Sequence, residues 1–188
     1  MSTERLVEES GALRRGHFLL SSGLHSPAYV QCALLLELPE RARRVGEELA
    51  ARLAPLAPQS VLSPALGGLI VGYEVAAALG VPFRFTERKG EAMELRRGFE
   101  LAAGERVVVV EDVITTGRST RETIAVAEAR DAQPVGVGAI IDRTAGGSGF
   151  AVPFAALMTL DLETYPPEAC PLCAAGSRPE KPGSRPGG

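Results

Sequence analysis

The sequence predicts an α/β fold in which a mostly parallel, doubly wound sheet is flanked by helices. Strand-like segments alternate along the chain with helical ones, as in sheets built from strand–helix–strand units. The clearest strand, Arg106–Val110, has four valines in five residues, which is typical of a strand covered on both faces. The 188 residues suit a single domain, which we expect to span residues 1–176.

The N-terminal segments are short. Leu6–Leu13 has the pattern of a short amphipathic helix, Gly16–Gly23 that of a strand running into a turn, and Tyr29–Leu35 that of extended or apolar structure. Pro39–Leu53 starts with proline, is rich in Ala, Glu and Arg, and places its aliphatic residues on one face. This pattern predicts a helix.

The middle and end of the chain supply the rest of the sheet. Helices are expected after Gly68, up to Leu79, and after Gly117, up to about Arg130. The segment Glu87–Gly98 is charged and lacks a period, so we expect a mobile loop. The tail 177–188 is rich in Pro, Gly and Ser and is expected to be disordered. The remaining predicted strands are Ser60–Ser63, Val81–Thr86, Val135–Ile141 and Phe154–Leu160.

Composition limits the possible partners. The chain is 45% hydrophobic, with a formal charge of −3, so no general electrostatic attraction draws it to nucleic acid or to anionic membranes. No apolar run approaches the roughly 20 residues that span a bilayer. The N-terminus lacks the basic segment followed by an apolar segment that marks a signal peptide. An odd number of cysteines, three, does not look like the disulfide framework of a secreted protein. We therefore expect a cytoplasmic protein.

The most informative segment runs from Val107 to Thr120. A buried strand ends in two adjacent acids, Glu111 and Asp112, at the carboxyl edge of the sheet, where open α/β folds bind ligands. Two acids at such a place are costly unless they bind hydroxyls, a metal or developing positive charge. Paired acids at a sheet edge therefore indicate a binding site.

A hydroxyl-rich turn follows the acids and opens a helix. Gly117 can adopt backbone angles that other residues avoid, and the first N–H groups of the helix point toward one place. Thr115, Thr116, Ser119 and Thr120 add hydroxyl donors. Acids beside a phosphate cradle suit a ribose 5-phosphate, whose hydroxyls would bind the acids while its phosphate binds the turn.

This segment resembles the motif with which type I phosphoribosyltransferases bind phosphoribosyl pyrophosphate (PRPP). The match runs without a gap from Val107 to Ser119, whereas a generic strand–turn–helix would share only its outline. The resemblance implies a type I phosphoribosyltransferase fold and a second, pyrophosphate-binding loop. The PRPP-binding residues that it implies are Glu111, Asp112, Val113, Ile114, Thr115, Thr116, Gly117, Arg118 and Ser119, with Ala65, Leu66 and Gly67 of the second loop.

Two further stretches resemble orotate phosphoribosyltransferases. Gly16–Pro27, with Tyr29 shortly after it, is similar to the N-terminal hood of that family, which implies a small hood formed mainly by residues 1–38. Arg143 follows the strand Val135–Ile141 at the place where the family pairs an arginine with the orotate carboxylate, a task that suits the guanidinium fork. The resemblance thus implies orotate binding by Tyr29, Thr115 and Arg143.

The third stretch is the charged segment Glu87–Gly98, which resembles the family's basic loop over the pyrophosphate. Arg88 and Lys89 match its leading Arg–Lys pair, but the later Lys and His of the family pattern are missing. Arg96 and Arg97 are the alternative sources of positive charge. Ser21 and Gly67 stand where the family has two other lysines, so Lys89 is the best catalytic cation beside Glu111 and Asp112.

The resemblance implies transfer of the phosphoribosyl group from PRPP to orotate in pyrimidine biosynthesis. It also implies Mg²⁺ as cofactor, held mainly by PRPP and water rather than by side chains. A homodimer is expected, with the 87–98 loop reaching the neighbouring site. A purine or uracil phosphoribosyltransferase and a non-catalytic PRPP-binding regulator remain alternatives, although those bases would give Arg143 no carboxylate to bind.

The sequence has one pair of closely spaced cysteines, Cys170 and Cys173, beyond the segment that the resemblance covers. A zinc site needs four ligands, so Cys32 and the histidines would have to complete it. Because no second pair is present, we expect two reduced thiols in a terminal extension.

Overall fold

The computed structural model describes residues 3–20, 22–144 and 147–182. These residues form two compact units, each of which is described by itself. The larger unit spans Leu36–Leu160, and the smaller one combines the N-terminal residues up to Leu35 with the segment from Asp161 onward. Within the described residues, no helix has the length and apolar character needed to cross a membrane.

The larger unit is built on one sheet of six strands in the order β5-β4-β3-β6-β7-β8. All neighbouring pairs are parallel except β4 and β5, which are antiparallel. The elements, in chain order, are α3 Pro39–Leu53, β3 Ser60–Pro64, α4 Gly68–Leu79, β4 Phe83–Lys89, β5 Ala92–Leu95, β6 Arg106–Ile114, α5 Arg118–Glu128, β7 Gln133–Asp142 and β8 Phe154–Thr159.

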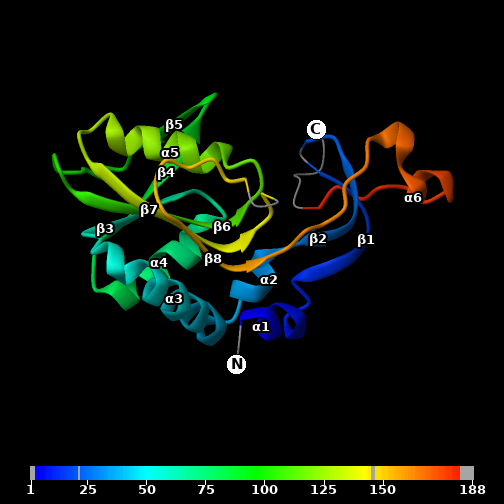
Figure 1. The fold of residues 1–188 in the computed structure, drawn as a ribbon, viewed down its shortest axis with the longest axis horizontal. Coiled ribbons are helices and arrows are strands. Elements are labelled where there is room, and N and C mark those ends of the chain that lie inside the picture. Colours follow the sequence, from blue (N-terminus) through cyan, green and yellow to red (C-terminus); the bar gives the residue numbers. More distant parts are fainter. Residues whose placement is uncertain (1–2, 21, 145–146, 183–188) are drawn as a thin grey trace. The chain divides into compact units, whose positions relative to one another are not determined.

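Helices cover both faces of this sheet. Figure 1 shows α3 and α4 together on one face and α5 on the other. The valines at 107–110 of β6 are completely buried between these layers, as expected for a strand with apolar neighbours above and below. The predicted fold class, a mostly parallel doubly wound α/β sheet, is therefore confirmed.

The smaller unit contains an antiparallel hairpin of β1 (Leu13–Leu19) and β2 (His25–Val30), preceded by α1 (Thr3–Glu9). A short helix, α2 (Cys32–Leu36), follows β2 and leads into the larger unit. The C-terminal segment carries a 3₁₀ turn at Pro167–Ala169 and the helix α6 at Pro171–Ala174. The C-terminal segment belongs to this unit because Glu180 pairs with Phe18 and Tyr165 with His25.

Several predicted boundaries need correction. The first helix covers Thr3–Glu9 rather than Leu6–Leu13, and Gly11 follows it in the left-handed conformation that commonly ends helices. The segment Tyr29–Leu35 is part strand and part helix. The tail predicted to be disordered from residue 177 pairs with β1 at Glu180, while residues 183–188 lie outside the described residues.

The expectation of a mobile loop at Glu87–Gly98 was wrong for most of its length. Strands β4 and β5 form a hairpin there, with Lys89 opposite Ala92 across a turn at Gly90–Glu91. The strand pattern was hidden because both strands carry charged side chains. As β5 is the edge strand of the sheet, it can keep charged side chains in water.

Candidate active site

The two loops singled out in the sequence follow two adjacent strands at the centre of the sheet. Strand β3 leads through α4 to β4 on one side, and β6 leads through α5 to β7 on the other. The strand order therefore reverses between β3 and β6. Such a switch point opens a crevice beyond the carboxyl ends of the strands, the usual ligand site of open α/β sheets.

The acid pair Glu111 and Asp112 lies within β6 rather than after it, which corrects the predicted end of this strand at Val110. Strand β6 pairs with β7 along its length, and Glu111 faces Ala139 in that register. On its other side, β6 pairs with β3 only through residues 107–109 of β6, which face residues 60–62 of β3. The acids are thus half-buried on the stretch of β6 that extends past β3.

The two carboxyl groups have different partners. The Thr120 hydroxyl donates to Oε2 of Glu111 at 2.5 Å, so Thr120, expected to face a phosphate, instead holds an acid in place. The backbone N–H of Val113 donates to Oδ1 of Asp112 at 2.9 Å. Each carboxylate keeps further lone pairs for a ligand.

Burial disfavours the charged form of both acids. The pKa of Glu111 is raised to about 7, chiefly by burial and also by the neighbouring Asp112 carboxylate, although the Thr120 hydrogen bond opposes both effects. Burial also raises the pKa of Asp112, against the hydrogen bond from Val113. Two acids whose negative charge is poorly solvated attract hydroxyl donors and positive charge at this edge.

The hydroxyl turn after β6 opens α5 without a side-chain cap. Thr115 and Thr116 are exposed, and Gly117 has a φ of 69° at the N-cap position. A methyl group on Gly117 would lie 3.0 Å from the ring of Phe150, so both the backbone angle and the close approach require glycine. The N–H of Arg118 makes a long hydrogen bond of 3.4 Å to the Thr116 hydroxyl oxygen, and the N–H groups of the next residues of α5 face the place where an anion would bind.

The turn is braced by residues that the sequence analysis missed. Arg121 donates hydrogen bonds to the carbonyl oxygens of Thr116 and Ser148, and its guanidinium stacks on Phe150. No pattern in the sequence indicates these contacts, because the spacing from Arg121 to Thr116 matches no helical pair and Phe150 comes from a distant loop. The bracing fixes the position of the turn relative to the end of β6.

The second loop touches the acid pair directly. A methyl group built on Gly67 would lie 2.5 Å from Oδ1 of Asp112, and one on Gly68 would lie 2.9 Å from the carbonyl oxygen of Val110. The Ala65–Leu66 peptide bond is cis, and the Leu66 side chain is 83% exposed. Backbone of the Ala65–Gly67 loop and the carboxylate of Asp112 thus line the same small volume.

The basic candidates lie on and around the β4–β5 hairpin. Arg88 forms an ion pair with Glu122 on α5, and Arg118 binds the same carboxylate at 2.9 Å. Lys89 lies 3.9 Å from Glu94 and is largely exposed. The β4–β5 hairpin thereby brings Arg88 into contact with α5, the helix that begins at the hydroxyl turn after β6.

Of the alternative cations, Arg97 is already engaged. It donates two hydrogen bonds to Glu87 and stacks on the ring of Phe85. This pairing also lowers the pKa of the Glu87 carboxyl. Arg96 is exposed at the end of β5. Arg88 is engaged as well, with Glu122 and with the Glu91 carbonyl oxygen, so Lys89, whose contact with Glu94 is long and exposed, is the least committed of these cations.

The candidates for base binding fall in both units. The backbone N–H of Arg143 donates to the carbonyl oxygen of Ile114 at 2.8 Å, which places Arg143 beside Thr115 at the end of β6. Its side chain is half-buried. Tyr29 lies on β2 of the smaller unit, where its ring contacts Phe18 at 5.8 Å. Ser21 lies outside the described residues.

Sequence comparison identifies relatives over nearly the whole chain. Residues 35–148 match the family described as phosphoribosyl transferase domain. An orotate phosphoribosyltransferase from Thermotoga maritima is 51% identical over 97% of both chains. Another, from Desulforamulus reducens, is 46% identical over 98% of both chains.

Solved structures show the same fold. An orotate phosphoribosyltransferase from Aeropyrum pernix has a TM-score of 0.71 at 27% identity and covers 85% of this chain and 94% of its own. An adenine phosphoribosyltransferase from Thermoanaerobacter pseudethanolicus has a TM-score of 0.70 at 18% identity, covering 82% and 99%. Because enzymes for different bases share this fold, the fold alone does not identify the base.

Proposed function

The chain belongs to the orotate phosphoribosyltransferase family, and on this basis we propose how the switch-point crevice carries out the reaction. The enzyme transfers the phosphoribosyl group of PRPP to orotate and releases pyrophosphate, giving orotidine 5′-monophosphate in pyrimidine biosynthesis. The roles of individual residues below are proposals that rest on their geometry.

The 5′-phosphate of PRPP binds at the start of α5. The N–H groups of the first turn of α5 and the exposed hydroxyls of Thr115 and Thr116 supply donors around one point. Arg121 stabilises the turn by donating a hydrogen bond to the carbonyl oxygen of Thr116. This anchoring fixes the ribose relative to the end of β6, which is the main requirement for aligning two reactants.

Glu111 and Asp112 hold the ribose hydroxyls and stabilise the sugar as it becomes cationic. The bond from C1′ to the pyrophosphate oxygen breaks while N1 of orotate forms a new bond on the opposite face, and the N1 proton passes to the released pyrophosphate. Positive charge develops on the ribose during this exchange, and two poorly solvated carboxylates beside it lower the energy of that state. No nucleophilic side chain is needed.

The leaving pyrophosphate meets the backbone of Ala65–Gly67 and the cations Arg88 and Lys89. Small residues let the loop backbone come close to phosphate oxygens, and the hairpin carries both cations at the carboxyl edge of the sheet. The carboxylate oxygens of Glu111 and Asp112 make the edge compatible with Mg²⁺, which would be held mainly by PRPP and water. When bound, Mg²⁺ offsets the growing charge of the pyrophosphate.

Orotate binds through Arg143, Thr115 and Tyr29. The planar guanidinium of Arg143 matches a carboxylate with two parallel hydrogen bonds. Its backbone position next to the end of β6 supports a place for the base beside the ribose site. For Tyr29, which belongs to the smaller unit, a role in base binding is proposed from the family resemblance alone.

The observation that carries this assignment is the convergence of both loops on the acid pair at the switch point, since Thr120 binds Glu111 and Gly67 lies against Asp112. The test is a panel of orotate, uracil, adenine and hypoxanthine, each with PRPP and Mg²⁺, in which base absorbance and pyrophosphate release are followed. Turnover of orotate alone is expected. Faster turnover of another base than of orotate would indicate a phosphoribosyltransferase for that base. PRPP binding without turnover of any base would indicate a non-catalytic regulator.

We expect Arg143→Ala to raise the KM for orotate roughly 10- to 100-fold, the range for losing a hydrogen-bonded charged partner. The KM for PRPP should change little, because the proposed PRPP contacts lie on other residues. Initial rates over both substrate ranges measure the two constants. Arg130→Ala, at the opposite end of α5, is the matched control, and equal increases in both KM values would contradict a role in carboxylate binding.

The elevated pKa of Glu111 gives a pH dependence. Ribose hydroxyls donate to the ionised form, so kcat/KM for PRPP should fall as the pH drops through about 7. Glu111→Gln should lower activity and remove this step. A profile of the wild-type enzyme without a transition near this pH would argue against the ribose contact.

The same pKa predicts the effect of Glu111 on stability. Folding raises the pKa of Glu111 from 4.5 to about 7. The contribution of Glu111 to the free energy of unfolding is therefore fully present below the ordinary carboxyl pKa and is lost as the pH rises through about 7. Glu111→Gln should therefore be more stable than the wild type above that pH, by up to roughly 3 kcal/mol. Urea unfolding at pH 5 and pH 8.5 compares the two proteins, and no gain at pH 8.5 would refute the prediction.

We further propose a homodimer in which the hairpin of residues 87–98 reaches the neighbouring site. Ile70 and Tyr73 are large, exposed apolar side chains on α4, and exposed Leu66 precedes them. Such a cluster is typical of a protein interface. A monomer in sedimentation velocity would rule out this proposal. We also propose a cytoplasmic location, in keeping with the absence of disulfide bonds from the described part of the chain.

A further inference from the structure

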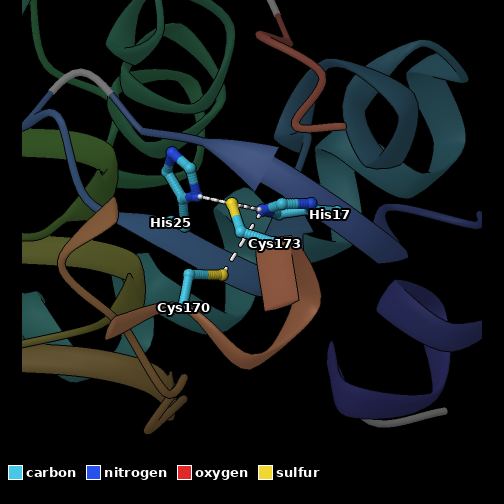
Figure 2. Close-up of side chains that lie close together, drawn as sticks. All are labelled: His17, His25, Cys170 and Cys173. Carbon is cyan, nitrogen blue, oxygen red and sulfur yellow. Dashed lines mark hydrogen bonds between the residues drawn. The ribbon is translucent and has the colours of Figure 1, made fainter. Parts of the chain in front are cut away.

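Four potential metal ligands, none of them assigned to PRPP, meet in the smaller unit. They are His17 on β1, His25 on β2, Cys170 just before α6, and Cys173 within α6. One ligand atom from each lies within 4.8 Å of all the others. Figure 2 shows the two thiols and the two imidazoles directed at one another.

The hairpin brings the two histidines to one face through a β-bulge. Arg15 faces Ala28 and Phe18 faces Ser26, so two residues of β1, Gly16 and His17, oppose one residue of β2. After the bulge, Leu19 faces His25, and His17 lies two residues from Leu19 on the same face.

The two cysteines come from one turn of helix. Cys170 occupies the N-cap position of α6, and Cys173 lies three residues later. The amide N–H of Ala174 donates to the carbonyl oxygen of Cys170 at 3.1 Å, which closes this turn. Side chains three residues apart lie on the same side of a helix, so both thiols are presented together to the hairpin.

The distances between ligand atoms match a tetrahedral zinc ion. With Zn–N near 2.05 Å and Zn–S near 2.3 Å, a tetrahedron has edges of about 3.3 Å between nitrogens and about 3.6 Å from nitrogen to sulfur. Nε2 of His17 lies 3.0 Å from Nδ1 of His25 and 3.5 Å from Sγ of Cys170. Sγ of Cys173 lies 3.8 Å and 3.4 Å from the same two nitrogens.

The surroundings also suit a metal. The Ser177 hydroxyl lies 3.2 Å from Nδ1 of His17, so that nitrogen can donate its proton to Ser177 while Nε2 keeps its lone pair for a metal. His17, His25 and Cys170 are buried. Two thiolates and two neutral imidazoles balance the charge of Zn²⁺, which lowers the cost of burying the ion.

We propose that His17, His25, Cys170 and Cys173 bind a structural Zn²⁺ ion. Four protein ligands leave no open position for substrate or water, which distinguishes structural from catalytic zinc. The ion joins the hairpin to a segment about 150 residues later in the chain and adds a cross-link to a unit too small to have a large core. From the sequence we expected reduced thiols here because no second cysteine pair is present, and nothing local links the cysteines to either histidine.

The test is the metal content of the full-length chain, purified under reducing conditions with any affinity tag removed. Inductively coupled plasma mass spectrometry should find about one zinc per chain in the wild type. Cys170→Ser/Cys173→Ser should contain almost none. Cys32→Ala is the matched control, because Cys32 is a buried thiol outside the cluster, and this variant should keep its zinc.

A second measurement covers the case in which the double variant does not fold. Wild-type protein stripped by a chelator is titrated with CoCl₂ under anaerobic conditions and then with ZnCl₂. The account expects the intense visible bands of tetrahedral Co²⁺ and a thiolate charge-transfer band, both lost when zinc displaces cobalt. The proposal would be overturned if the purified protein contained no zinc and its stripped form gave no such bands. Full zinc retention by the double variant would also overturn it.

Discussion

We expect Asp112→Asn to fold like the wild type and to lose about 10²- to 10³-fold in kcat, the usual effect of removing one preorganised electrostatic contact. Asparagine keeps the shape of the side chain and can still accept the Val113 N–H bond. It lacks the negative charge that the cationic ribose requires. Because burial already raises the pKa of Asp112, a neutral side chain should not destabilise the fold. Steady-state rates and thermal unfolding measure the two effects separately.

The matched control is Asp131→Asn, an exposed residue in the turn between α5 and β7. Its positive φ of 57° is tolerated by asparagine as well as by aspartate. This variant should keep the wild-type rate. If Asp112→Asn also kept the wild-type kcat, Asp112 would have no part in the mechanism.

The second large effect is expected for Gly67→Ala. The added methyl group would lie 2.5 Å from Oδ1 of Asp112 and 2.8 Å from its Cγ and Oδ2, so the loop or the carboxylate must shift. A displacement on the order of 1 Å in a catalytic arrangement can cost about 10²-fold. We expect a loss of this size in kcat/KM for PRPP, measured by initial rates at saturating orotate.

Gly147→Ala controls for the general effect of replacing a glycine. Among the described residues, a methyl group on Gly147 would meet only the Thr144 carbonyl oxygen, at an ordinary contact distance of 3.7 Å. It should leave kcat/KM unchanged. An unchanged value for Gly67→Ala as well would mean that the Ala65–Gly67 loop does not line the reacting groups.

The sequence predicted the centre of the fold well because local and global signals agree there. The run of valines in β6, the acids after it and the glycine of the turn all point to a buried strand that feeds a helix. The two loops were found from their own residues, and the sheet order then placed them on adjacent strands. Their meeting at Gly67 and Asp112 needed the structure, since it depends on which strands are neighbours.

Other features were missed because their partners are distant in the chain. The charged hairpin at Glu87–Gly98 has strand pairing that its side-chain pattern hides. The C-terminal segment is ordered by Glu180 and Tyr165, which pair with strands at the other end of the sequence. Local composition predicted a disordered tail there, and it could not anticipate bridges to β1 and β2.

The most direct test of the central claim is equilibrium dialysis of the wild-type protein with radiolabelled PRPP in the presence of Mg²⁺. The account predicts a single saturable site per chain, from which ribose 5-phosphate and pyrophosphate each displace the label. Retention of no label at any PRPP concentration would contradict the claim that paired acids beside an amide-lined turn bind a sugar phosphate.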